Sequence, residues 1–316
     1  YYNTQRIGSI MIDPKYKVQA DLLLQTIPYV AKETIFALKG GTAINLFVRS
    51  MPRLSVDIDL TYLPIDDRET ALKSISDGLG RIKADLEKSI SGISVTPASR
   101  EGQDVKINCQ VPGAQIKIEV NSTTRGSINQ PGLMRVHKVV EEAFGRFAAI
   151  NVVSFSELFG GKVCAALDRQ HPRDLFDVRL LQDNEGLSND IIIGFMVALL
   201  SHMRPINEVI RPKFINQRHA FETQFSGMAD IPFSYDDFER TREQLINDIH
   251  LKLTEKDRLF LLSFKEGIPD WENFIVRNAK ELPAINWKLQ NIIRLKKENS
   301  KKHKEMVRFL ERALYV

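Results

Sequence analysis

The chain has 316 residues, 43% of them hydrophobic and 27% charged, a balance typical of a folded globular protein with one large domain or two ordinary ones. No apolar run reaches the roughly 18 residues that a membrane-spanning helix needs, and two cysteines are too few for a disulfide framework. The net charge is +4, but residues 287–316 hold nine Lys or Arg and three Glu, so this tail carries +6, the remainder sums to −2, and the asymmetry predicts a polyanionic partner.

The composition also bounds the location and the metal chemistry. Residues 1–12 lack the layout of a signal peptide, so we expect a cytoplasmic protein with no membrane partner. The six histidines are scattered and do not pair with cysteines at ligand spacing, which argues against a zinc site.

The first half of the chain predicts a mixed β-sheet with covering helices. In chain order we expect a helix over 16–31, a strand over 34–38, a helix over 42–49, a strand around 57–59, a helix over 66–89, strands over 104–110 and 114–121, and a strand over 148–153. Pro28 disturbs the end of the first helix, and Pro52 stops the second. Residues 111–113 (Val-Pro-Gly) are a turn signal that joins two alternating strands into a hairpin, and 125–131 is expected to be a loop.

The second half predicts helices alone. Residues 154–157 (Ser-Phe-Ser-Glu) fit a capping box that opens a helix ending near Arg169, and Pro172 suits the first turn of the next helix. The later helices are expected over 173–182, 191–202, 236–253, 255–265, 271–282 and 287–314. We therefore predict an α+β fold, with a mixed-sheet domain over residues 1–186 and an all-helical domain with a basic last helix over 187–316.

Asp57-Ile58-Asp59 is the most informative motif in the chain. In a strand, side chains two residues apart point to the same face, so the two carboxylates project together while Ile58 turns to the opposite, buried face. Two carboxylates held so close repel each other unless a cation lies between them, and Mg²⁺ suits such a pair and usually brings substrate phosphates with it.

A glycine turn precedes this strand. Gly40 and Gly41 let the backbone approach a bulky anion, and a following helix beginning near Thr42 directs its first amides at a phosphate. Glycine turn and acidic strand together predict a site for a metal-bound phosphate.

These motifs resemble the signature of the nucleotidyltransferase superfamily, in which a Gly-Gly or Gly-Ser turn precedes an Asp-x-Asp strand and a third carboxylate follows on a later strand. Residues 39–46 (Lys-Gly-Gly-Thr-Ala-x-Asn-Leu) and 53–60 (Arg-x-Ser-x-Asp-Ile-Asp-Leu) are similar to the AbiEii/AbiGii toxin family, which includes the MenT-type toxins. Residues 156–166 resemble that family's helix with a functional lysine, and 172–178 resemble its final Arg-Asp-x-x-Asp motif. The matching motifs cover roughly residues 38–180.

The resemblance implies a nucleotidyltransferase-like sheet domain and a set of site residues. The implied catalytic residues are Asp57, Asp59, Glu119, Lys162 and Asp174. The first three would also form the metal site, for one or two Mg²⁺, and Glu119 would help take the proton from an attacking hydroxyl. The residues implied to bind the nucleotide are Gly40, Gly41, Thr42, Ser55 and Lys162. Lys162 would neutralise phosphate charge, and Asp174 would orient Lys162 or the incoming group.

The function that the resemblance implies is that of a toxin from a bacterial toxin–antitoxin or abortive-infection system, which acts in phage defence. The enzyme would move NMP from an NTP to an acceptor, with the 3′ end of tRNA or another RNA as the favoured acceptor, and so block aminoacylation and growth. A cognate antitoxin is implied, whether or not the two proteins touch. Two alternatives stay open: nucleotidyl transfer to a protein hydroxyl or a small molecule, and a non-catalytic module that binds a nucleotide or a partner.

Each motif also has a simpler interpretation. Asp-x-Asp and Glu119 are compatible with a solvated strand face, and Gly40-Gly41 with an ordinary turn. Lys162 would then be an exposed helix lysine, and Arg173 with Asp177 a surface ion pair at helical spacing. The basic tail would be a solvated face.

Overall fold

The computed structural model describes residues 5–7, 10–12 and 14–315. Residues 1–4 and 8–9 of the segment in which we expect no signal peptide lie outside this description. The chain divides into two compact units, one formed by residues 1–154 and 224–232 and the other by 155–223 and 233–316. In this division the helices that follow residue 154 belong to the second unit. The sequence analysis instead predicted a domain boundary at residue 186.

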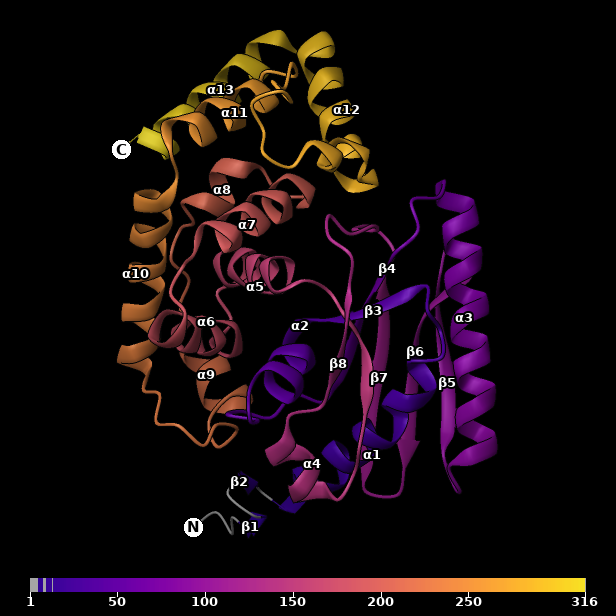
Figure 1. The fold of residues 1–316 in the computed structure, drawn as a ribbon. Helices are drawn as coiled ribbons and strands as arrows, with labels where there is room; N and C mark the ends of the chain where they lie inside the picture. Colours follow the sequence, from indigo (N-terminus) through magenta and orange to yellow (C-terminus); the bar gives the residue numbers. More distant parts are fainter. Residues whose placement is uncertain (1–4, 8–9, 13, 316) are drawn as a thin grey trace. The chain divides into compact units, whose positions relative to one another are not determined.

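The first unit is built on a seven-stranded mixed sheet with the order β5-β6-β7-β4-β3-β9-β8 (Figure 1). Its strands are β3 (Phe36–Lys39), β4 (Asp57–Tyr62), β5 (Ser94–Arg100), β6 (Gln103–Val111), β7 (Ala114–Asn121), β8 (Gly132–Arg135) and β9 (Ala149–Val152). The central strand β4 pairs antiparallel with β3 and parallel with β7. A separate small ribbon joins β1 (Gln5–Ile7) to β2 (Ile10–Ile12).

Helices α1 (Pro14–Val30) and α3 (Arg68–Ser89) contact each other and cover one face of the sheet, α1 over β7 and β9 and α3 over β5 and β6. The alternating strand residues on that face, among them Ile58, Leu60 and Ile118, are fully buried. Gly78 does not interrupt α3, because it is the point where the helix packs against the ring of Phe36, 3.0 Å from where a β-carbon would lie. This apolar layer fixes the opposite face of β4 as the one that carries the aspartates.

The hairpin of β6 and β7 is confirmed, with Val111 opposite Ala114 and Gly113 at a φ of +84° in the turn. The edge strands β5 and β8 and the short helix α4 (Lys138–Phe144) were not predicted. The sequence of β5 lacks the alternation that marks a half-buried strand, because this strand buries only Val95 and contains Pro97.

A segment far along the chain completes the first unit. Residues 224–232 return to pair with the loop before β4: Leu54 N donates to Met228 O (2.9 Å), Asp230 N donates to Pro52 O (3.0 Å), and Arg53 forms a β-bridge with Ala229. No local sequence pattern predicts this pairing, because it joins residues more than 170 positions apart.

The second unit is helical, so the α+β class is confirmed. Its helices are α5 (Phe155–Arg169), α6 (Pro172–Asn184), α7 (Asn189–Ser201), α8 (Ile206–Ile210), α9 (Arg218–Gln224, of which Gln224 falls in the first unit), α10 (Tyr235–Lys252), α11 (Glu255–Lys265), α12 (Pro283–Glu298) and α13 (Ser300–Tyr315). Helices α5 and α7 touch backbone to backbone at Gly160 and Gly194: a β-carbon on Gly160 would lie 2.2 Å from the carbonyl carbon of Gly194.

Two predictions for this unit were wrong. The helix expected over 271–282 is instead a turn followed by a short 3-10 segment, η2 (Arg277–Glu281). The single helix expected over 287–314 is two helices, because Asn299 has a φ of −146° and a ψ of 75°, which no α-helix accommodates.

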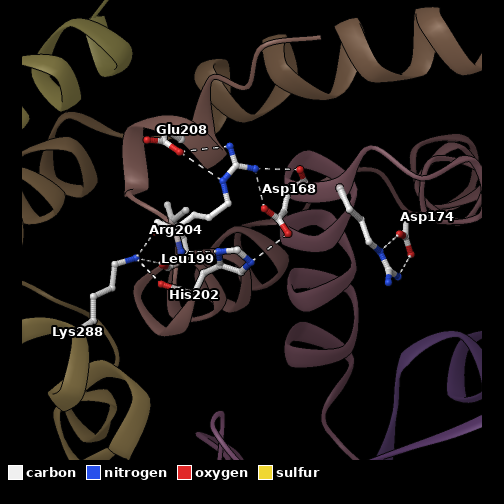
Figure 2. A network of polar contacts seen from close by, with 8 residues as sticks. Asp168, Asp174, Leu199, His202, Arg204, Glu208 and Lys288 are labelled. Atoms are coloured by element: carbon white, nitrogen blue, oxygen red, sulfur yellow. Dashed lines mark hydrogen bonds and ion pairs between the residues drawn. The ribbon is translucent and has the colours of Figure 1, made fainter. Parts of the chain in front are cut away.

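A polar network ties α12 to the end of α7 (Figure 2). The buried ammonium of Lys288 donates to the carbonyls of Leu199 (3.0 Å), His202 (2.7 Å) and Arg204 (2.9 Å). Asp168 on α5 accepts from Arg204 at 2.8 Å and lies 3.4 Å from the ring of His202. Lys288 therefore joins α12 to the last turn of α7 and to the segment that follows it.

Candidate active site

Asp57 and Asp59 project from the same face of β4, as predicted. The strand alternates over residues 57–60: both aspartates are half-buried, whereas Ile58 and Leu60 have no exposed surface. The apolar residues are held by the helices on the other side of the sheet, so the two carboxylates are fixed on the face away from α1 and α3.

The strand register brings Glu119 to the same place. Asp59 lies directly opposite Glu119 on the parallel neighbour β7, and opposite Lys39 on β3. Residues opposite each other in a sheet share a face, so Glu119 stands beside Asp59. The row continues to Lys106 on β6, opposite Glu119, and the neighbouring row sets Asp57 opposite Lys117.

Lys117 is one of the cations on this acidic face, and it pairs with Glu119. Its Nζ lies 3.0 Å from a carboxylate oxygen of Glu119, with both side chains partly exposed. Burial alone would lower the pKa of Lys117, but the hydrogen bond with Glu119 and the charges of Asp57, Glu119 and Asp59 outweigh it and raise the pKa above its ordinary value. An ammonium thus lies in the field of all three predicted carboxylates.

The glycine turn lies directly against the aspartates. Gly40 has a φ of +73°, a conformation that L-residues rarely adopt, and a β-carbon there would lie 2.7 Å from a carboxylate oxygen of Asp59. At Gly41 a β-carbon would come within 2.8 Å of Arg53 Nη2 and 2.9 Å of Ser55 Oγ. A side chain at Gly40 would be strained by the positive φ and by the Asp59 β-carbon 3.2 Å away, and one at Gly41 would displace the ends of the Arg53 and Ser55 side chains, so glycine backbone faces the polar groups here.

The two glycines begin the short helix α2 (Gly40–Thr42), which the π-helical segment η1 (Ala43–Val48) continues. Buried Thr42 links the helix to β4, because its hydroxyl donates to Asp57 O (2.5 Å) and lies 3.1 Å from Ser55 Oγ. Asn45 Nδ2 donates to Gly41 O (2.9 Å), which holds the turn in place from the inside. Thr42 and Ser55 are therefore brought together, as the predicted nucleotide site requires.

Arg53 lies beside the glycine turn, although the sequence pattern assigned it no role. It is buried, donates from Nη1 to Leu54 O (2.8 Å), and places Nη2 against Gly41. Its position in the Arg-x-Ser-x-Asp motif was the available signal. It places a fixed positive charge beside the backbone that we expect to meet a phosphate.

Asp57, Asp59 and Glu119 are suitable ligand types for a divalent cation, but their side chains are not arranged as a three-carboxylate metal site. Asp57, Asp59 and Glu119 offer the oxygen ligands that Mg²⁺ prefers, on one face of adjacent strands. Within the part of the chain that the structure describes, however, no three acidic, His or Cys side chains come close enough together to hold a metal ion. Glu119 pairs with Lys117 instead.

Lys162 and Asp174 lie in the second unit and contact each other (Figure 2 shows Asp174). Lys162 Nζ, on α5, donates to Asp174 Oδ1 (2.8 Å) and lies 3.0 Å from Asp177 Oδ2, both on α6. Asp174 also accepts from Arg169 (2.5 and 2.9 Å). Burial would raise the pKa of Asp174, but Lys162 and then Arg169 outweigh it and hold the pKa well below its ordinary value.

This buried network corrects two of the simpler interpretations. Lys162 is only 6% exposed, so it is not a solvated helix lysine, and Asp177 is 1% exposed, so its carboxylate is buried and does not lie on a solvated face. Helix spacing suggested a partner for Asp177 on its own helix, whereas tertiary packing supplies Lys162 from α5. The charge of Lys162 is balanced by two carboxylates within its own unit.

Comparison with known proteins identifies the family. The model of the family described as "Nucleotidyl transferase AbiEii toxin, Type IV TA system" matches residues 21–291. The chain belongs to this AbiEii family. It is a nucleotidyltransferase and a toxin of a toxin–antitoxin system, so the resemblance stated from the motifs is confirmed.

Solved structures agree on the fold. MenT4, a nucleotidyltransferase toxin from Mycobacterium tuberculosis H37Rv, superposes with a TM-score of 0.59 at 14% identity, over 87% of this chain and 93% of that one. The AbiEii chain thus has the nucleotidyltransferase-toxin fold along most of its length. A search of curated proteins found no match. Among the described residues, no helix is long and apolar enough to cross a membrane.

Proposed function

We propose that this AbiEii protein moves a nucleoside monophosphate from an NTP to the 3′ end of tRNA, in a Mg²⁺-dependent reaction that blocks aminoacylation and growth. The observation that carries the proposal is the contact between the two halves of the predicted site: Gly40 lies so close to Asp59 that no side chain fits between them. A phosphate seated on the glycine backbone would therefore lie beside the carboxylate pair.

The nucleotide-binding residues act through their positions. The turn at Gly40 and Gly41 offers backbone amides at the start of α2, and the hydroxyls of Thr42 and Ser55 and the guanidinium of Arg53 lie beside it. These groups bind and orient the triphosphate, and Arg53 neutralises part of its charge.

The carboxylates supply the rest of the site. When bound, Mg²⁺, in one or two copies, would stabilise the charge of the transferring phosphate and of the pyrophosphate that leaves. Asp57, Asp59 and Glu119 would hold it, with Glu119 released from Lys117. Glu119 also accepts the proton of the attacking hydroxyl, because its carboxylate is partly exposed.

We assign Lys162 a role in neutralising nucleotide charge, oriented by Asp174. The proposal rests on the family motif and on the direct contact of the two side chains at 2.8 Å. Lys162 pairs with two carboxylates, Asp174 and Asp177. To contact a phosphate it would have to release at least one of them, so its proposed role depends on this network between α5 and α6.

RNA is the acceptor class that the charge favours. The last thirty residues carry the chain's excess of Lys and Arg, which suits a polyanion, and tRNA is the RNA whose modification at the 3′ end stops translation outright. We further propose that the toxin acts in the cytoplasm, serves phage defence by abortive infection, and is silenced by an antitoxin encoded nearby.

The test is incubation of the purified protein with each α-labelled NTP in turn, Mg²⁺ and total cellular RNA, followed by sequencing of RNA 3′ ends. The proposal expects label on tRNA, added nucleotides at its 3′ end, and loss of both on chelation of the metal. Label that migrates with protein or with small solutes would instead identify a different acceptor. NTP binding without release of pyrophosphate under any of these conditions would identify a non-catalytic module.

A further inference from the structure

The break at Asn299 creates a basic corner, which we define as residues 294–304. It brings the last turn of α12 next to the first turn of α13, and the two helices pack on each other (Figure 1). One glutamate, Glu298, lies among its cations. The cationic side chains of the corner are Arg294, Lys296, Lys297, Lys301, Lys302 and Lys304.

These six side chains are available to a partner. All of them are exposed, and among the described residues none of the ion pairs within 4.0 Å involves any of them. Arg294 and Lys296 donate only to neutral oxygens, of Asn291 (2.8 Å) and Glu266 (the backbone carbonyl, 2.9 Å). Five net positive charges thus stand within eleven residues without internal neutralisation.

The placement of two of these lysines works against helix stability. The first turn of α13 contains Lys301 and Lys302 and no acidic residue, although the positive end of the helix dipole favours carboxylates there. The turn is otherwise well formed, since Asn299 Oδ1 accepts from Lys302 N (3.0 Å). Two lysines that destabilise an otherwise well-formed first turn indicate that positive charge is needed there for function.

The corner is held firmly. His303 is 4% exposed and its Nε2 lies 2.9 Å from Lys265 O, while Lys296 Nζ donates to Glu266 O at 2.9 Å. Both acceptors lie at the end of α11, so one contact on each side of Asn299 fixes the bend. A fixed array of cations loses less entropy on binding than a mobile tail.

We propose that the basic corner binds the phosphate backbone of the acceptor RNA. The inference rests on the proposed function, because it supplies the docking surface for that acceptor. A phosphate backbone needs cations without an apolar centre, and Leu295 is the sole apolar residue between 294 and 304. An acidic protein partner is less suited to the corner, since protein interfaces have an apolar core and the corner itself offers only the half-buried Leu295.

The experiment measures binding of the full chain to total tRNA without NTP, at several salt concentrations. The corner variant combines Lys297→Glu, Lys301→Glu and Lys302→Glu. The control variant combines Lys252→Glu, Lys256→Glu and Lys280→Glu, three exposed lysines of the same unit outside the corner. At about 100 mM salt we expect the corner variant to bind at least tenfold more weakly, with a salt dependence shallower by about two phosphate contacts, and the control to change by about threefold or less.

A second measurement separates binding from folding. Glutamates at 301 and 302 suit the dipole of α13, whereas the glutamate at 297 opposes that of α12, so the thermal midpoint of the corner variant should stay close to that of the unmodified protein. A neutral variant, Lys301→Gln with Lys302→Gln, should weaken tRNA binding in the same direction by a smaller factor. Weaker binding with an undiminished midpoint supports the inference.

The outcomes also separate this inference from the proposed function. If the corner variant binds tRNA as the control does, the inference is overturned, even where label transfer to tRNA is intact. If the corner variant loses affinity for an acidic polypeptide such as poly-glutamate but keeps its affinity for tRNA, a protein partner replaces RNA and the inference is likewise overturned. If tRNA binding falls as expected while no NTP labels RNA, the docking surface stands and the proposed reaction falls.

Discussion

Charge balance on the acidic face is the residue-scale feature that governs the site. Asp57, Asp59 and Glu119 share one face of β4 and β7, and Lys117 lies among them. The pair of Lys117 and Glu119 is partly exposed, so it stabilises the fold by about 1 kcal/mol at most and can yield to a stronger cation. The protein is thus able to keep three carboxylates together before any metal binds.

This balance predicts that Lys117 competes with the metal. Lys117→Met should tighten Mn²⁺ binding to the nucleotide-free protein by about tenfold, because it removes a positive charge from within a few ångströms of the ion. The measurement is a Mn²⁺ titration followed by electron paramagnetic resonance. Lys106→Met is the matched control, since Lys106 lies on the same face but one strand further from the aspartates, and its effect should be smaller. Equal effects of both changes would contradict the assignment.

The glycine turn gives a second prediction at this scale. Gly40→Ala should lower activity more than tenfold, because the new β-carbon meets the Asp59 carboxylate. Gly113→Ala is its control: Gly113 also has a positive φ, +84°, but nothing lies within 4 Å of the added carbon. Both variants should lose about 1–2 kcal/mol of stability from backbone strain, and only the first should lose nucleotidyl transfer. An active Gly40→Ala variant would mean that the close approach has no function.

At the scale of elements, the helices of the second unit depend on close backbone packing and a buried charge network. In Gly160→Ala the added carbon would lie 2.2–2.3 Å from backbone atoms of Gly194 and Phe195, which cannot move aside cheaply. We expect a loss of about 3 kcal/mol or more in the free energy of unfolding. The neighbouring Gly161→Ala meets nothing within 4 Å and should gain about 0.5–1 kcal/mol. Denaturant titrations of the two variants measure this difference, and similar stabilities would refute the packing argument.

The buried network of α5 and α6 predicts a pH dependence. The folded pKa of Asp174 lies below its ordinary value of 3.8, so below about pH 4 the unfolded chain takes up the proton first and stability falls as the pH falls. Above that pH the contribution is fully present. Asp174→Asn should cost about 3–5 kcal/mol at neutral pH and flatten the acid limb, since it leaves Lys162 and Asp177 unbalanced.

The same helix provides the control for this change. Asp183→Asn removes the exposed ion pair with Arg179 and should cost about 0.5 kcal/mol or less. Urea unfolding followed by circular dichroism between pH 3 and pH 7 compares the two variants. An Asp174→Asn protein as stable as Asp183→Asn, with an unchanged acid limb, would contradict the network.

Sequence reasoning succeeded at these scales where local patterns dictate structure. Alternation placed Asp57 and Asp59 on one face, and the Val-Pro-Gly turn predicted the hairpin of β6 and β7, whose second strand carries Glu119. It failed where packing between distant segments decides. The return of residues 224–232 to Arg53, and the pairing of Asp177 with Lys162, have no local signal. At Asn299 the flanking residues continue a helical pattern, but the Asn299 side chain accepts from Lys302 N at the start of α13, and contacts with α11 hold the bend.

At the scale of the whole molecule, chemistry and charge are divided between two units. The first unit holds the carboxylates and the glycine turn, and the second holds the Lys162–Asp174 pair and the basic corner. Membership of the AbiEii family extends over residues 21–291 and so spans both units. We therefore expect catalysis to need both units, with acceptor binding and phosphoryl chemistry separable by mutation.

The most direct test of the central claim compares Asp59→Asn with Asp77→Asn in the transfer of labelled NMP to RNA. Asp77 is an exposed aspartate on α3 and serves as the matched control. The account predicts at least a 100-fold loss of transfer in Asp59→Asn, with unchanged melting and RNA affinity, and full activity in Asp77→Asn. Transfer by Asp59→Asn at the rate of the unmodified protein would show that the acidic strand does not carry the reaction.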